Sequence, residues 1–104
     1  METVLIADDE KNIREGIKCI IDWEELGFKV CGEAANGEEA LKQIYELHPS
    51  LVLLDIKMPK LTGLEVVENA REHGYNGKFI ILSGFSDFKF AQTEKTHQDK
   101  NNTS

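Results

Sequence analysis

Polar side chains that could do chemistry stand where apolar segments of the sequence end. Asp8 and Asp9 follow the first such segment, Asp55 follows the third, and the hydroxyl of Ser83 follows the fourth. Carboxylates brought together repel one another unless a cation lies among them, and Mg²⁺ prefers such hard oxygen ligands. A carboxylate can also act as a nucleophile toward a phosphoryl group. The residue types therefore predict Mg²⁺-assisted phosphorylation of one of these aspartates.

The elements that must position these residues alternate between two hydrophobic periods. Short apolar runs that are typical of strands lie at 3–7, 28–32, 51–54 and 79–82. Apolar residues at helical spacing lie between them, at 13–21, 40–47 and 64–70, and a further helical group begins at 85. This alternation predicts an α/β fold built on a doubly wound parallel sheet.

Helix boundaries are marked by side chains that satisfy free backbone groups. Asn36 precedes Glu39, and Thr62 precedes Glu65, at the spacing of a capping box. Pro49 disfavours helical backbone in the residue before it, so the second helix is expected to end ahead of it.

In this fold class, the polar residues at the ends of separate strands can belong to a single site. In open parallel sheets, ligands bind outside the carboxyl ends of the strands. The continuous apolar runs 51–54 and 79–82 favour central strands that helices cover on both faces. Taken alone, an acidic residue after a strand caps the next helix, and Ser83 beside Gly84 is typical of a turn. Their occurrence at several strand ends favours a shared site.

Composition narrows the class of protein. The chain has 104 residues, 12 Lys and Arg and 19 Asp and Glu, and a net charge of −7. That length predicts one domain, and the lack of a basic cluster predicts no nucleic-acid contact by this segment. The sequence has neither a signal peptide nor an apolar stretch of about 18 residues, so we expect a cytoplasmic protein without membrane contact. Cys19 and Cys31 lie in apolar runs without metal-ligand spacing, and we expect both to be buried, reduced thiols.

The end of the sequence differs in composition from the rest. Residues 92–104 include no hydrophobic side chain, so they cannot bury enough apolar surface to offset the entropy of ordering them. We therefore expect residues 1–91 to form the domain and residues 92–104 to form a polar, disordered tail.

Several phrases of the sequence resemble the receiver domain of two-component response regulators. They are VLIADDE at 4–10, LLDIKMP at 53–59 with Gly63, and IILSG at 80–84. Two more, IDWEELGF at 21–28 and SGFSDF at 83–88, are similar to the subgroup that precedes AraC-type DNA-binding domains. The resemblance covers residues 2 to about 91 and implies a flavodoxin-like fold.

The resemblance also implies roles for individual residues. Asp55 matches the acceptor of a phosphoryl group from a sensor histidine kinase. Asp9 matches a direct Mg²⁺ ligand, Asp8 its neighbour that helps hold the ion, and Lys57 the position whose backbone carbonyl is a ligand. Ser83 matches the switch hydroxyl that hydrogen-bonds the phosphoryl oxygens. A protein of this kind is not an enzyme and regulates transcription through an output domain.

One departure from the family bears on this function. A receiver continues into a fifth strand, a lysine followed by proline, and a fifth helix, whereas Lys95 and Lys100 lie in the polar segment. We therefore expect a receiver fold without the fifth strand and fifth helix. Such a chain would keep the Mg²⁺-binding half of the site and have weak or no phosphorylation, because the lysine stabilises charge on the phosphoryl group.

Other readings remain open. An uncovered strand at 79–82 would be an apolar edge, which favours a homodimer or a strand-exchanged oligomer. The chain could thus be an inert receiver that acts only as a protein-interaction or dimerisation module. A haloacid-dehalogenase-like phosphatase also uses an aspartate nucleophile with Mg²⁺, but it needs a second aspartate where Lys57 stands.

Overall fold

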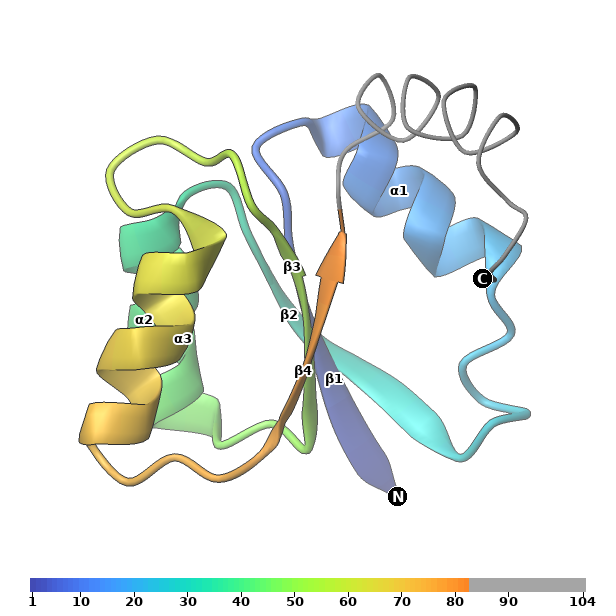
Figure 1. The fold of residues 1–104 in the computed structure, drawn as a ribbon. Helices are drawn as coiled ribbons and strands as arrows, with labels where there is room; N and C mark the ends of the chain where they lie inside the picture. The colour runs from blue at the N-terminus through green and yellow to red at the C-terminus, as the bar shows by residue number, and fades with distance from the viewer. Residues whose placement is uncertain (83–104) are drawn as a thin grey trace, which may run out of the picture.

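The structure, a computed structural model, describes residues 1–82. These residues form strands and helices in strict alternation (Figure 1). In chain order they are β1 (Glu2–Ala7), α1 (Lys11–Ile20), β2 (Phe28–Ala34), α2 (Gly37–Leu47), β3 (Leu51–Asp55), α3 (Gly63–Glu72) and β4 (Lys78–Leu82).

All neighbouring strands pair in parallel, in the order β2-β1-β3-β4. The chain first moves outward from β1 to β2 and then crosses back to β3, so the strand order reverses beside β1. Helices α2 and α3 cover one face of the sheet, and α1 covers the other (Figure 1). The predicted doubly wound parallel sheet is therefore confirmed, with four strands among the described residues.

The strand β1 is buried on both faces, and its side chains divide between two apolar clusters. Leu5 and Ala7 belong to the larger cluster, under α2 and α3. Val4 and Ile6 belong to the smaller one, on the side of α1. Because a strand presents successive side chains to opposite faces, this division follows from the continuous apolar run. The strand end is thereby fixed from both sides, directly before the acidic residues.

The capping residues act as the sequence predicts. The side chain of Asn36 accepts a hydrogen bond of 2.9 Å from the backbone N–H of Glu39. Thr62 and Glu65 form a complete capping box, in which each side chain accepts from the other residue's backbone N–H. The helix α2 ends before Pro49, as expected.

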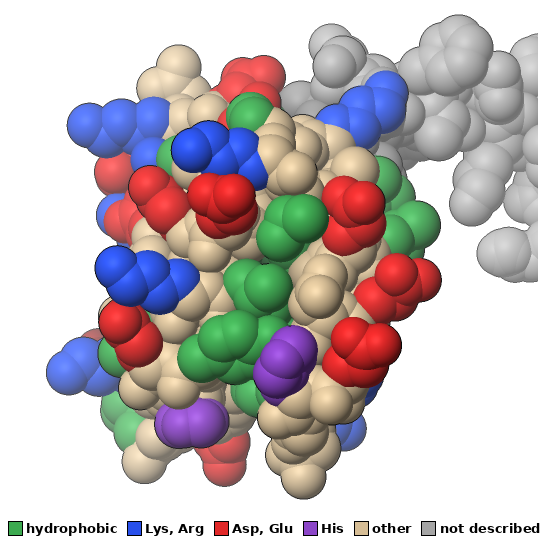
Figure 2. Space-filling view, turned by 90° about the vertical axis from the view of Figure 1, so that its left-hand side faces the viewer, with side chains coloured by type: hydrophobic (Ala, Val, Ile, Leu, Met, Phe, Trp, Pro, Cys, Tyr) green, Lys and Arg blue, Asp and Glu red, His purple; other side chains and the backbone are tan. Residues whose placement is uncertain are grey.

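The outer surface of α2 and α3 is largely polar. Figure 2 shows this face, with charged side chains around a strip of apolar ones and with histidines near one end. The exposed apolar side chains of these two helices are Tyr45, Leu47 and Leu64. The helices therefore turn their small and apolar residues inward, among them Ala40, Ile44, Val66 and Ala70.

The exposed side chains of α1 include two that lie in apolar runs of the sequence. Ile20 is 80% exposed and Cys19 is also exposed, so the prediction that both thiols are buried is wrong for Cys19. Cys31 is half-buried, and both cysteines are free thiols. The half-buried face of α1 includes Ile17, which packs against the smaller apolar cluster as its spacing predicts, and also Arg14 and Lys18, which form ion pairs with Glu33 of β2.

The sequence offers two expectations for β4, a central strand and an open apolar edge. The strand lies at the edge of the sheet formed by the described residues, and Ile80 and Ile81 are 49% and 38% exposed. Ser83, the helical group beginning at 85 and the polar segment 92–104 lie outside the described residues. Within residues 1–82, the helices are too short or too polar to cross a bilayer.

Candidate functional site

The three strand-end carboxylates gather at one point of the sheet. One oxygen atom from each of Asp8, Asp9 and Asp55 lies within 4.8 Å of the others. The cause is the register of β1 and β3, in which Ala7 pairs with Leu54, so that the next residue of each strand emerges at the same edge. This edge lies beside the reversal in strand order, where open α/β sheets bind ligands. The sequence-predicted carboxylates therefore form a single acidic cluster.

Asp8 is held by the protein at all of its polar atoms except one. Its side chain and backbone are almost fully buried, with 1% of the residue exposed. The N–H of Asp8 donates to the carbonyl of Ala34 at 3.0 Å, and its own carbonyl accepts from Arg14 Nη1 at 2.6 Å. The Oδ1 atom accepts from the N–H of Glu10 at 2.9 Å, while Oδ2 is buried without a hydrogen-bond partner among the described residues.

The electrostatics of the cluster oppose full ionisation. The pKa of Asp8 is raised from 3.8 to about 6. Burial is the largest cause, the N–H of Glu10 opposes it, and the negative charges of Asp55 and Asp9 add to the rise. A buried, unpartnered carboxylate oxygen beside two further carboxylates suits a cation, which would relieve both the desolvation and the repulsion. The donor set of carboxylate oxygens fits Mg²⁺, which binds through few carboxylates and keeps several waters.

Asp55 is positioned by a close approach of backbone to backbone. It is the last residue of β3 and is buried. The N–H of Gly63 donates to the carbonyl of Ile56 at 2.8 Å, and a Cβ at Gly63 would lie 2.4 Å from the carbonyl oxygen of Asp55. Only glycine allows the start of α3 to lie against the end of β3 here. The buried Met58 fixes the intervening loop to the larger core cluster.

Two further residues, Lys57 and Ser83, are predicted from the sequence to belong to the site. The side chain of Lys57 is exposed, two residues beyond Asp55 on the same loop. Ser83 is outside the described residues, but Leu82, which precedes it, pairs with Asp55 in the sheet. The N–H of Ile56 donates to the carbonyl of Leu82 at 3.3 Å, so the end of β4 adjoins the site.

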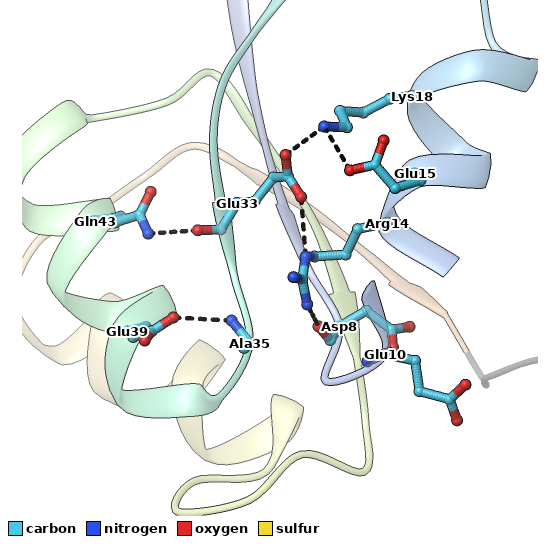
Figure 3. A network of polar contacts seen from close by, with 9 residues as sticks. All are labelled: Asp8, Glu10, Arg14, Glu15, Lys18, Glu33, Ala35, Glu39 and Gln43. Carbon is cyan, nitrogen blue, oxygen red and sulfur yellow. Dashed lines mark hydrogen bonds and ion pairs between the residues drawn. The ribbon is translucent and has the colours of Figure 1, made fainter. Parts of the chain in front are cut away.

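A network of polar contacts beside the cluster is not visible in the sequence pattern. It joins α1 to β2 and to the end of β1 (Figure 3). Arg14 and Lys18 of α1 both bind the carboxylate of Glu33 on β2, and Arg14 also binds the backbone of Asp8. The only signal in the sequence is the spacing of four between the two cations, which places them on one helix face.

Comparisons with known proteins agree with this geometry. The family model described as response regulator receiver domain matches residues 4–98. The uncharacterized transcriptional regulatory protein YesN of Bacillus subtilis is 41% identical over 92 residues, which are 88% of this chain and 25% of that protein. The chain thus spans about a quarter of the length of this curated relative.

Solved structures match the fold over most of its length. The receiver (REC) domain of AraT, a response regulator from Geobacillus stearothermophilus, is 39% identical with a TM-score of 0.77, covering 95% of this chain and 77% of that one. A chain of the CheX-CheY-BeF3-Mg complex from Borrelia burgdorferi is 28% identical with a TM-score of 0.70, covering 89% and 72%.

Proposed function

Because this chain belongs to the response regulator receiver family of two-component systems, we propose that Asp55 accepts a phosphoryl group in a Mg²⁺-dependent step. The observation that carries the proposal is the acidic cluster, in which Asp8, Asp9 and Asp55 converge and Asp8 Oδ2 is buried without a hydrogen-bond partner among residues 1–82. The family match gives no support to the phosphatase alternative.

The proposed ion would be held by the carboxylates of Asp8, Asp9 and Asp55 and by the backbone carbonyl of Lys57. When bound, Mg²⁺ neutralises the carboxylates and the oxygens of the phosphoryl group. The likeness to a chain of the CheX-CheY-BeF3-Mg complex from Borrelia burgdorferi supports this assignment.

The phosphoryl donor is proposed to be the phosphohistidine of a sensor histidine kinase. An oxygen of Asp55 forms a bond to phosphorus while the bond from phosphorus to the imidazole nitrogen breaks, and the imidazole then takes up a proton. The hydroxyl of Ser83 donates a hydrogen bond to the new phosphoryl group, whose added charge favours a nearby donor. This moves the hydroxyl toward the end of β3 and couples phosphorylation to the strand β4.

The wider role is proposed from the relatives. YesN is named a transcriptional regulatory protein, and this chain matches only a quarter of its length. We therefore propose that the receiver controls an output domain that regulates transcription in the cytoplasm.

The proposal is tested by measuring Mg²⁺ binding by calorimetry and modification by acetyl phosphate with mass spectrometry. We expect a phosphoryl adduct on Asp55 that needs Mg²⁺ and that is lost in Asp55→Asn. Lys57→Ala is the matched control, because it keeps the backbone carbonyl, and should bind Mg²⁺ like the wild type. Absence of Mg²⁺ binding by the wild type, or an adduct that survives in Asp55→Asn, would refute the proposal.

A second candidate function is an interaction or dimerisation module without chemistry. The half-exposed Ile80 and Ile81 favour it, because β4 is an edge strand within residues 1–82 and apolar edge strands pair with other chains. It predicts a dimer in light scattering at high concentration and a Mg²⁺ affinity that Asp9→Ala leaves unchanged. A monomer whose Mg²⁺ binding is lost in Asp9→Ala would exclude it.

A further inference from the structure

We infer that Arg14 is a positioning residue for the Mg²⁺ site, because its guanidinium fixes the peptide that joins Asp8 to Asp9. This inference rests on the proposed function. Arg14 Nη1 donates to the carbonyl oxygen of Asp8 at 2.6 Å, and Nε donates to Glu33 Oε1 at 2.9 Å (Figure 3). The planar fork of the guanidinium thus joins the turn after β1 to the carboxylate of a β2 residue.

The anchor of this fork is itself held from several directions. The second carboxylate oxygen of Glu33 binds Lys18 Nζ, which also pairs with Glu15 at 3.3 Å. The backbone carbonyl of Glu33 accepts from Gln43 Nε2 of α2 at 2.6 Å. Lys18 and Arg14 lower the pKa of Glu33, so its carboxylate stays charged. Because Glu33 is held by residues of α1 and α2, the guanidinium of Arg14 that binds it also holds the carbonyl of Asp8 in place.

The backbone at Asp8 is fixed on both sides by these contacts. Its N–H is held by Ala34 and its carbonyl by Arg14, so both adjoining peptide groups are oriented. The peptide after the carbonyl leads directly to Asp9, whose carboxylate is the exposed member of the cluster. Loss of the hydrogen bond from Arg14 to the carbonyl of Asp8 would therefore affect the orientation of Asp9 more than that of the other two carboxylates. Contacts that orient metal ligands commonly change affinity about 10–100-fold.

Arg14 is poorly placed for two simpler roles. It lies in the first turn of α1, where the helix dipole disfavours cations, so it does not stabilise the helix end. Its charge is matched within the network, since Arg14 and Lys18 carry two positive charges and Glu15 and Glu33 two negative ones. Neutralising the acidic cluster is therefore not its main effect.

A positioning role and simple electrostatics predict opposite changes in Mg²⁺ affinity for the substitution Arg14→Gln. Arg14→Gln removes a positive charge near an anionic site, which by Coulomb's law alone would tighten Mg²⁺ binding. If Arg14 orients the ligands, the same substitution weakens binding instead. Arg14→Lys keeps the charge but lacks the fork that joins Glu33 to Asp8, so positioning predicts weaker binding for it as well.

The experiment is calorimetric titration of the full 104-residue chain and its variants with MgCl₂ at pH 7.5. We expect Arg14→Gln and Arg14→Lys each to weaken Mg²⁺ binding by about tenfold. Lys11→Gln is the matched control, because it removes the same charge from an exposed side chain in the same helical turn. It should leave the affinity unchanged or slightly tighter.

The outcomes separate the two claims. If the wild type does not bind Mg²⁺, the proposed function fails. If the wild type binds and both Arg14 variants bind as tightly or more tightly, the positioning role is wrong. Unfolding in urea with EDTA measures the folded fraction of each variant. If Arg14→Gln does not fold, Arg14→Lys decides between the outcomes.

Discussion

The two faces of the sheet are built in different ways. Under α2 and α3 lies the larger apolar cluster, and both helices bury residues such as Ile44 and Val66 in it. The helix α1 on the other face has no fully buried residue; its partly buried Ile17 packs against the smaller apolar cluster, and Arg14 and Lys18 form ion pairs with Glu33 of β2. One face therefore supplies most of the stability, while the other orients the turn that carries the acidic cluster.

The largest expected difference between the faces is the cost of removing an apolar side chain. Ile44→Ala on α2 should lower the free energy of unfolding by about 3 kcal/mol, because the side chain is fully buried in the larger cluster. Ile20→Ala on α1 should change it by less than about 0.5 kcal/mol, because Ile20 is exposed. Urea unfolding of both variants measures this difference, and equal effects would refute it.

Replacing a glycine by alanine in α2 and in α1 also tests how closely each helix is packed. A Cβ at Gly37, the first residue of α2, would lie 2.2 Å from the carbonyl oxygen of Leu61, so Gly37→Ala should destabilise by about 2 kcal/mol. At Gly16 in α1 nothing lies within 4 Å of a Cβ, and Gly16→Ala should stabilise by about 0.5–1 kcal/mol. Thermal unfolding should therefore move in opposite directions for the two variants, and a shared direction would contradict the comparison.

The pH dependence of stability tests the cluster itself. Because the folded state raises the pKa of Asp8 to about 6, it binds more protons than the unfolded chain between about pH 4 and 6, and stability falls as pH rises through that window. With EDTA present, Asp8→Asn should stabilise the protein above pH 6, on the order of 1–2 kcal/mol, and have little effect below pH 4. A gain that persists at pH 3.5 would contradict this origin. Mg²⁺ should reduce the difference, since it binds only the folded wild type well.

The smallest expected effect lies in the loop that joins the site to the α2–α3 face. Lys60 has a φ of 75°, in the left-handed region that glycine adopts without strain. Its ion pair with Glu38, at 3.7 Å, is exposed and contributes little. Lys60→Gly should therefore raise the free energy of unfolding by about 0.5 kcal/mol, whereas Lys60→Val should lower it. Unfolding in urea distinguishes the two, and no difference between them would refute strain at this position.

Local patterns predicted the elements well because their causes are local. The capping residues Asn36 and Thr62 mark the starts of α2 and α3, and Pro49 marks the end of α2. The rotation of α1 could not be predicted in the same way. Its apolar spacing favours a buried Ile20, but Ile20 is exposed, and Arg14 and Lys18 form ion pairs with Glu33. Because Glu33 is distant in sequence from both cations, no local pattern indicates these contacts.

The sequence by itself determined the period of each element, the helix caps, and the presence of acidic residues directly after β1 and at the end of β3. These follow from backbone and side-chain preferences that act over a few residues. Only the tertiary structure decided that Asp8, Asp9 and Asp55 share one point, that Asp8 Oδ2 is buried with no partner in the described part of the chain, and that Arg14 holds the carbonyl of Asp8. Those facts depend on strand register and burial, which are set by contacts between segments far apart in the chain.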